Sequence, residues 1–195
     1  GAAAMSRGAK VQLEMGGKNP LVVVDDANLD QAVEVAVQGS SYSTGQRCTA
    51  SSRLVVTAGI HDAFVEKLVA RAKALVVGDA RAKDTQIGPA ASQAQLEQNL
   101  RYIQLGKQEG ANLLCGGEQV ERASPGFYFT PAVFSGCTPD MKVVREEIFG
   151  PVACVQKAAN YDEALALANA TEFGLSAGIC TTSLKTAADF KRKAQ

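Results

Sequence analysis

Cys48 is the residue of this sequence best suited to nucleophilic chemistry. It lies in the segment 43–50, which reads Ser-Thr-Gly-Gln-Arg-Cys-Thr-Ala and is typical of an exposed loop. A loop gives a thiol access to solvent and ligands, and the adjacent Arg47 could favour the thiolate form. Because most free cysteines are inert, the alternative for Cys48 taken alone is an unreactive surface thiol.

The other four cysteines have different surroundings. Cys115, Cys154 and Cys180 each lie in an apolar run typical of a strand, where cysteine usually packs as a small hydrophobic residue. Cys137 lies in a short segment of Gly, Thr and Pro with no acid–base motif nearby. Five cysteines at irregular spacing, without a CxxC pair, indicate neither a disulfide framework nor a zinc site. Free thiols in a reducing cytoplasm, and no metal, are therefore expected.

A thiol nucleophile needs a base or a lowered pKa. The only histidine, His61, is at the start of a predicted amphipathic helix, where an exposed or capping role is expected, so a Cys–His pair explains the sequence poorly. Glu14 is the candidate general base toward water. It precedes Gly16 and Gly17 in the string Leu-Glu-Met-Gly-Gly-Lys-Asn-Pro over 13–20, and glycines let main chain and ligand approach closely. The alternative for Glu14 is an ordinary loop carboxylate.

A third string, Arg-Glu-Glu-Ile-Phe-Gly-Pro over 145–151, places two carboxylates before an aromatic ring and a Gly-Pro stop. Glu147 could accept hydrogen bonds from sugar hydroxyls, and the Phe149 ring could lie against a flat ligand. The alternative is a solvated, charged turn with Phe149 packed into the core.

The elements that must position these residues follow from the spacing of apolar side chains. Residues 1–7 are Ala-rich and predict a helix end that Gly8 stops. Strands are predicted over 11–13, 21–24, 53–57, 112–115, 128–134, 152–156 and 177–181. Helices are predicted over 29–41, 60–76, 92–109, 161–170 and onward from a cap at Ser183. This alternation predicts an α/β fold, a three-layer domain whose mostly parallel, twisted sheet is flanked by helices.

Composition excludes several other classes of protein. Lys and Arg total 20, and Asp and Glu total 20, so the zero net charge does not favour binding to nucleic acid or to an anionic membrane. Apolar runs such as 21–24 are far shorter than the ~20 residues of a membrane span, and the start has no apolar signal-peptide core. The last helical pattern has no C-terminal cap or Gly stop, as expected of a segment from a longer protein.

The three strings together resemble the aldehyde dehydrogenase superfamily. Its Leu-Glu-x-Gly-Gly-Lys-x-Pro string matches residues 13–20, its Gly-Gln-x-Cys string matches 45–48, and its Glu-Glu-Ile-Phe-Gly-Pro string matches 146–151. They occur in the family's order, and Cys48 follows Glu14 by 34 positions. Three strings in order and at this spacing are far more specific than any one of them alone.

The resemblance implies a chemical role for each matched residue. Cys48 attacks an aldehyde to form a thiohemiacetal, which becomes a thioester when hydride passes to NAD or NADP. Glu14 then activates the water that releases the carboxylic acid. The main-chain N–H of Cys48 is implied to be one donor to the oxyanion. The family's second donor, an Asn side chain, lies upstream and has no counterpart here.

For the cofactor, the resemblance implies contacts from four residues. Glu147 holds the nicotinamide ribose with Phe149 packed near it, while Met15 and Gly16 supply main chain close to the carboxamide. The family's adenosine pocket lies upstream, so the choice between NAD and NADP stays open. The similarity runs through residues 10–195, and within the family it favours bacterial enzymes of the ketoglutarate-semialdehyde type.

The resemblance also implies a division of the chain. Residues 1–13 correspond to the end of the cofactor-binding domain, a helix plus a strand, and residues 14–195 to the catalytic domain, truncated at its C-terminus. The implied partner is a small aldehyde, and the full-length parent is implied to be a homo-oligomer, a dimer or a tetramer. The chain alone is expected to show little or no dehydrogenase activity. The alternatives are a non-catalytic scaffold module of the same fold and a thiol esterase.

Overall fold

A computed structural model describes residues 1–195 and contains one six-stranded sheet of order β3-β4-β5-β2-β1-β6. Neighbouring strands are parallel except for the antiparallel pair β3 and β4. The predicted mostly parallel α/β fold is therefore confirmed. The strands are β1 Pro20–Val23, β2 Arg53–Thr57, β3 Asn112–Cys115, β4 Ala132–Ser135, β5 Val152–Ala158 and β6 Gly178–Cys180.

Seven α-helices and one 3-10 turn connect these strands. Ser92 and Ser183 each cap a helix by accepting the N–H of the residue three positions later, so the cap predicted at Ser183 is confirmed. No helix combines the length and the apolar character needed to cross a bilayer. The helices are α1 Ala2–Met5, α2 Leu29–Ser41, α3 Ala58–Lys73, α4 Gln93–Gln108, α5 Lys142–Arg145, α6 Tyr161–Asn169 and α7 Leu184–Lys193, and the 3-10 turn is η1 Tyr42–Gly45.

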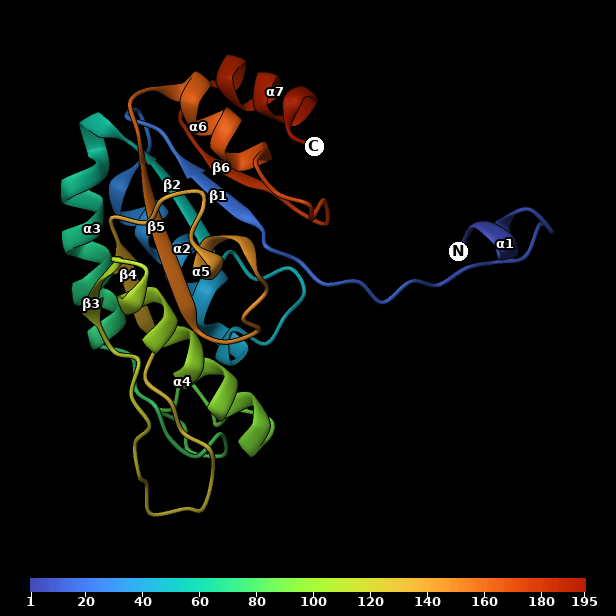
Figure 1. Cartoon of the computed structure of the whole chain (residues 1–195). Coiled ribbons are helices and arrows are strands. Elements are labelled where there is room, and N and C mark those ends of the chain that lie inside the picture. Colours follow the sequence, from blue (N-terminus) through green and yellow to red (C-terminus); the bar gives the residue numbers. More distant parts are fainter.

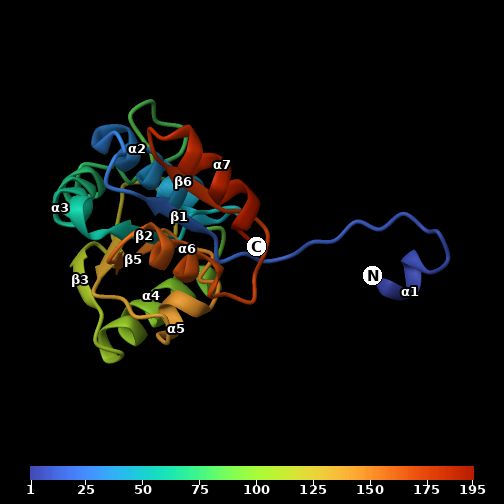
Figure 2. The ribbon, with the colours of Figure 1, turned by 90° about the horizontal axis from the view of Figure 1, so that it is seen from above.

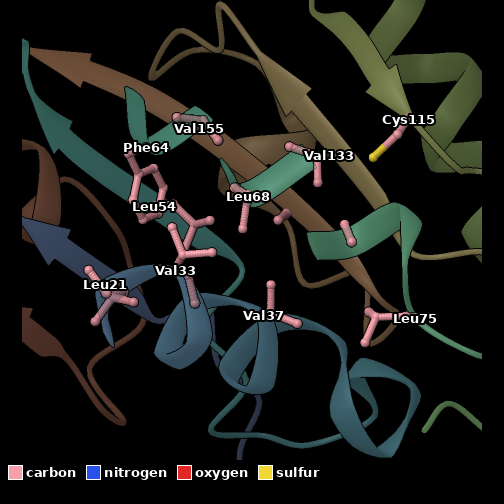
Figure 3. Close-up of a cluster of buried hydrophobic side chains, with 14 of the residues drawn as sticks. Leu21, Val33, Val37, Leu54, Phe64, Leu68, Leu75, Cys115, Val133 and Val155 are labelled. Carbon is pink, nitrogen blue, oxygen red and sulfur yellow. The ribbon is translucent and has the colours of Figure 1, made fainter. Parts of the chain in front are cut away.

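The central strands of the sheet are buried on both faces, as near-continuous apolar strands require. In β1 the side chains alternate, with Leu21 and Val23 on the face covered by α2 and α3, and Val22 on the face covered by α6. Figure 2 shows α2 and α3 on one side of the strands and α4 and α5 on the other. Figure 3 shows side chains of the first face, where Phe64 and Leu68 of α3 meet the strands. The sheet thus forms the middle of three layers.

The structure corrects the expectation for the start of the chain. Residues 9–15 are exposed and form no strand, so the strand predicted over 11–13 is wrong. Figure 1 shows this stretch leaving the sheet and running away from the body of the molecule to the single turn of α1. The apolar alternation at Val11 and Leu13 is real, but these side chains are exposed because no neighbouring strand pairs with them.

Smaller differences concern element ends. The helix predicted over 60–76 spans Ala58–Lys73, and the short α5 was not predicted. The strand predicted over 128–134 begins only at Ala132, directly after Pro131. Proline has no N–H to donate to a neighbouring strand. Before Pro131 the main chain instead forms an isolated bridge between Phe129 and Gln119.

Candidate active site

Cys48 lies in a loop over residues 42–50, here called the nucleophile loop, which follows α2 directly. Its start is unusual, because Ser43, Thr44 and Gly45 all have left-handed φ angles of 56°, 57° and 64°. Only glycine adopts this conformation routinely. The side chain of Thr44 anchors this strained turn to a distant loop, because its hydroxyl donates to the Gly88 carbonyl at 3.1 Å. The loop therefore carries the free, exposed Cys48 thiol on a fixed main chain.

Arg47 holds the same loop from the other side. Its guanidinium donates to the carbonyls of Gln38 and Gly39, at 2.7 and 2.9 Å, near the end of α2. These carbonyls lack intrahelical partners at a helix end, where a cation is favourable. The sequence suggested that Arg47 favours the Cys48 thiolate, whereas in the structure its hydrogen bonds go to the main chain of α2. Its observed contribution is to fix the loop.

Residues 16–19, here called the strap, pass directly beneath Cys48. A Cβ atom at Gly17 would lie 2.2 Å from the Cys48 carbonyl oxygen, so no side chain fits at that position. The buried Asn19 donates from Nδ2 to the carbonyls of Cys48 and Ala50, at 2.7 and 3.0 Å. Its Oδ1 accepts the Ser176 N–H at 3.1 Å. Strap and nucleophile loop are thus one packed unit.

The string 145–151, here called the cofactor string, meets the strap on its other side. The Gly17 N–H donates to Glu147 Oε1 at 2.9 Å. A Cβ at Gly16 would be 2.3 Å from Glu147 Oε2, and one at Gly45 would be 2.3 Å from the main chain of Gly150. Close contacts at Gly16, Gly17 and Gly45 therefore join the strap and the nucleophile loop to the cofactor string, which lies more than a hundred residues later in the sequence.

The sequence left open that Phe149 packs into the core, but its side chain is exposed. Its main chain has a left-handed φ of 57°. A non-glycine residue in this conformation is uncommon and often marks a functional position. Phe149, Glu147 and Gly17 line a hollow of about 10 Å³ together with Gly45, Arg47, Ala50, Ser52, Ile148 and Gly150. The hollow is too small to enclose a ligand.

Glu14, the predicted general base, is not brought to Cys48 in this structure. It lies on the exposed N-terminal segment, residues 1–15, and its carboxylate accepts a hydrogen bond only from Gln12, at 3.2 Å. Met15 is also exposed, while Gly16 is half-buried against Glu147. Of the six predicted site residues, Cys48, Gly16, Glu147 and Phe149 gather around the strap, whereas Glu14 and Met15 remain on the segment that leads to it.

Arg53 supports the strap and Lys18 lies within it, and both are buried cations that sequence reasoning did not single out. Arg53 donates from Nε to the Lys18 carbonyl at 2.8 Å, and its other nitrogens donate to the carbonyls of Leu167 and Ala168 at the end of α6. Burial lowers the pKa of Arg53 to about 10. Burial also lowers the pKa of Lys18, whose Nζ has no hydrogen-bond partner. An arginine opening an apolar strand was the available signal for Arg53.

The remaining cysteines agree with the sequence-based expectation of unreactive thiols, although Cys137, expected on a loop, is buried in the core. Cys115, Cys137 and Cys154 are buried, and Cys180 is half-buried. Burial raises the pKa of the Cys115 and Cys180 thiols, and contact with the Cys154 thiol together with burial raises that of Cys137. A raised pKa suppresses the nucleophilic thiolate. Cys48 is the one cysteine that the structure exposes.

His61, the only histidine, is engaged within α3. Its Nδ1 lies 2.6 Å from a carboxylate oxygen of the neighbouring Asp62. The exposed or capping role expected from the sequence is wrong, because the His61 side chain is only 14% exposed and the N-cap of α3 is Thr57. No hydrogen bond joins His61 to the nucleophile loop.

Comparison with known proteins places this geometry in context. The family model described as the aldehyde dehydrogenase family matches residues 1–195. The chain is 50% identical over 186 residues to an alpha-ketoglutaric semialdehyde dehydrogenase of Bacillus subtilis, covering 94% of this chain and 38% of that protein. It is 48% identical over 177 residues to a betaine aldehyde dehydrogenase of Mesorhizobium japonicum, covering 90% of this chain and 36% of that protein.

Solved structures agree with the sequence comparisons. The crystal structure of an NAD-dependent aldehyde dehydrogenase from Sinorhizobium meliloti is similar with a TM-score of 0.92 and 44% identity, over 98% of this chain and 38% of that one. A betaine aldehyde dehydrogenase from Staphylococcus aureus, in complex with NAD+, has a TM-score of 0.92 and 34% identity, over 97% of this chain and 38% of that one. The chain spans less than two fifths of the length of these relatives.

Proposed function

This chain belongs to the aldehyde dehydrogenase family, and on that premise we propose that it carries the catalytic domain of an NAD(P)-dependent aldehyde dehydrogenase with Cys48 as nucleophile. The observation that carries the proposal is the setting of Cys48. It is an exposed free thiol on a loop fixed by Thr44, Arg47 and Asn19. Its own main-chain N–H donates no hydrogen bond within the protein. A nucleophile beside an unused donor is the arrangement that acyl chemistry requires.

In the proposed reaction the Cys48 thiolate adds to the aldehyde carbonyl, and the carbonyl oxygen becomes the oxyanion of a thiohemiacetal. The Cys48 N–H is free to donate to that oxygen. Loss of hydride converts the thiohemiacetal to a thioester on Cys48. Water then attacks the thioester, and the carboxylic acid leaves as the thiol is restored. A thiolate serves both steps, because it is a good nucleophile and a good leaving group from an acyl carbon.

Glu14 is proposed as the base that takes a proton from the attacking water. Support comes from its matched position in the string 13–20 and from the strap, which connects it directly to the floor of the site. In the chain as described, Glu14 is on the exposed N-terminal segment. The proposal therefore requires this segment to be held over Cys48 by parts that the longer relatives possess.

The residues present fit a nicotinamide cofactor. Glu147 Oε2 accepts no hydrogen bond from the protein, so it is available to a ribose hydroxyl. The exposed ring of Phe149 offers a flat apolar face beside it. The absence of side chains at Gly16 and Gly17 leaves the approach to Glu147 open. Bound NAD or NADP would supply the hydride acceptor, and these residues would orient it against Cys48.

For the substrate, we propose a small aliphatic semialdehyde. The support is the 50% identity to the Bacillus subtilis protein named alpha-ketoglutaric semialdehyde dehydrogenase. We further propose that residues 1–13 belong to the cofactor-binding part and residues 14–195 to the catalytic part. A homo-oligomeric parent, dimer or tetramer, and a cytoplasmic location remain predictions. The chain alone should show little or no dehydrogenase activity.

A chimera tests the proposal most sharply. In the chimera, this chain replaces the matching 186-residue region of the Bacillus subtilis relative. The rest of that relative remains and supplies the cofactor-binding part. The chimera should reduce NAD+ in the presence of 2-oxoglutarate semialdehyde, and Cys48→Ala should abolish the increase in NADH absorbance. Cys180→Ala is the matched control and should retain the rate. An active Cys48→Ala chimera would refute the proposal, as would a folded chimera that is inactive with every aldehyde tried.

The chain alone provides the complementary test. Rapid NADH formation by the 195 residues without the added part would contradict the expectation of an incomplete site. Cys48-dependent hydrolysis of an activated ester, combined with a chimera that oxidises no aldehyde, would favour the thiol-esterase alternative. The loss of both activities in a folded protein would favour the scaffold alternative.

A further inference from the structure

Asn19 makes more connections to the nucleophile loop than any other side chain of the strap. It is only 3% exposed and lies immediately before β1. Its amide nitrogen donates to the carbonyls of Cys48 and Ala50, at 2.7 and 3.0 Å. Its amide oxygen accepts the Ser176 N–H at 3.1 Å. The orientation of the amide is determined by this network, since the reverse orientation would set an oxygen against two carbonyls.

The two peptide groups that flank the Cα atom of Cys48 are both fixed. On one side, the Arg47 carbonyl accepts the Ala50 N–H at 3.0 Å. On the other side, the Cys48 carbonyl accepts from Asn19 at 2.7 Å and packs against Gly17. The two soft main-chain torsions of Cys48 are therefore set by these bonds. Asn19 supplies the only side-chain hydrogen bond to either peptide group.

The consequence concerns the free N–H of Cys48. This N–H belongs to the same planar, trans peptide group as the Arg47 carbonyl, so it points in the opposite direction from that carbonyl. The carbonyl is turned inward to Ala50, and the N–H donates to no protein acceptor. A donor of this kind is effective only when it is already aligned before charge develops on the substrate oxygen.

We propose that Asn19 is a positioning residue for Cys48. By holding the Cys48 carbonyl, it keeps the adjacent N–H aimed at the oxyanion that forms when the thiolate adds to a carbonyl carbon. This inference rests on the proposed role of Cys48 as nucleophile. Asn19 itself touches neither substrate nor thiol, and acts through the main chain.

Two reactions of Cys48 separate positioning from simple packing. With 4-nitrophenyl acetate, the thiolate adds to the carbonyl through an oxyanion, 4-nitrophenolate leaves, and a thioester remains on Cys48. With iodoacetamide, sulfur displaces iodide at a saturated carbon and no oxyanion forms. Both products can be quantified at Cys48 by peptide mass spectrometry on the 195-residue chain. The ratio of the two rate constants reports on alignment of the N–H, independently of thiol exposure and ionisation.

Asn19→Ala should lower the acylation rate constant about tenfold, and change alkylation less than twofold, because only acylation uses the donor. Asn19→Ser should lower the ratio as well, since its shorter hydroxyl cannot reach both carbonyls. Asn169→Ala is the matched control. Its amide also joins two segments, through Lys193 and Gln195, but it has no contact with the nucleophile loop, so the ratio should not change.

Different results would overturn the positioning role of Asn19 and the nucleophilic role of Cys48. The variants are compared at a temperature at which circular dichroism shows the native signal, and if Asn19→Ala does not fold, Asn19→Ser decides. An unchanged ratio in the folded Asn19 variant overturns the inference and leaves the nucleophile in place. A native chain that is alkylated but never acylated at Cys48 overturns the proposed function, and the inference with it. A lowered ratio in the Asn19 variants but not in Asn169→Ala supports both.

Discussion

Two regions of this chain that meet at residue 16 are built in opposite ways. The strap, the nucleophile loop and the cofactor string are held by buried hydrogen bonds and by glycine contacts too close to admit a Cβ atom. The N-terminal segment carries Glu14 and Met15, is exposed almost throughout, and leaves the body of the molecule (Figure 1). The nucleophile therefore belongs to the part that this chain folds by itself, and the candidate base does not.

The difference shows which part of the candidate site is determined locally. Cys48 and Glu147 are fixed by contacts that lie within the chain, so their relative positions follow from this sequence alone. The position of Glu14 depends on a surface against which residues 9–15 can pack, and the chain offers none. Matched substitutions in the two regions test this difference.

The largest contrast should come from two glycines with similar left-handed φ angles. Gly45 has a φ of 64° and Gly8 a φ of 69°, but a Cβ at Gly45 would lie 2.3 Å from Gly150, whereas nothing lies within 4 Å of a Cβ at Gly8. Gly45→Ala should destabilise the fold by about 3 kcal/mol or more. Gly8→Ala should leave the unfolding midpoint in urea unchanged, because its segment can relax. Equal midpoints for the two variants would show that Gly45 is not packed as described.

A second contrast uses arginines. Arg53 is buried and donates to three main-chain carbonyls, whereas Arg7 is exposed on the N-terminal segment. Arg53→Met should lower the free energy of unfolding by roughly 3 kcal/mol, because it leaves buried carbonyls without partners. Arg7→Met should change it by less than about 0.5 kcal/mol. Urea denaturation monitored by circular dichroism measures both, and a near-neutral Arg53→Met would contradict the supporting role given to this cation.

The smallest contrast removes one donor to a carboxylate in each region. The buried Tyr102 donates to Glu146 of the cofactor string at 2.7 Å, and Gln12 donates to Glu14 at 3.2 Å. Tyr102→Phe should lower stability by about 1 kcal/mol near neutral pH, and Gln12→Ala should have no measurable effect. A comparable loss in both variants would remove the distinction between the regions.

Tyr102 also predicts a pH dependence. Burial, together with the hydrogen bond to Glu146, raises the pKa of Tyr102 from 10 in the unfolded chain to about 12 in the folded chain. The stabilisation is therefore fully present below pH 10 and is lost as the pH rises from 10 to 12. Burial and the hydrogen bond to Asp189 also raise the pKa of Tyr161 to about 12. Ultraviolet titration of phenolate should therefore show two late-titrating tyrosines in the unsubstituted chain and one in Tyr102→Phe. An unchanged titration curve would contradict the assignment.

Much of the fold was predictable from the sequence. The mostly apolar runs at 21–24, 53–57 and 152–156 predicted central strands, because strands buried on both faces are nearly continuous in apolar residues. The strand expected over 11–13 shows the limit of this reasoning. Its alternating pattern predicts a surface that must be covered, but the pattern cannot say whether the covering strand lies in the same chain.

The candidate site was predictable in its reactive residues but not in their supports. Short strings singled out Cys48, Glu14 and Glu147 as candidates, because their types match a reaction, and their roles stay predictions. Asn19 and Arg53 act through main-chain carbonyls, and a carbonyl is present at every residue, so its partner leaves no trace in the sequence. Arg53 meets Leu167 and Ala168 across more than a hundred positions, a contact that only the folded chain defines.

We propose that Cys48 carries the acyl group and that Glu14, on the segment the chain cannot fix by itself, releases it. The most direct measurement is rapid mixing of the chimera carrying Glu14→Gln with semialdehyde and NAD+. A burst of NADH equal to the number of active sites should be followed by a steady rate at least ~100-fold below that of the unsubstituted chimera. Peptide mapping after the burst should find the acyl group on Cys48. An undiminished steady rate, or the absence of any burst, would contradict the account.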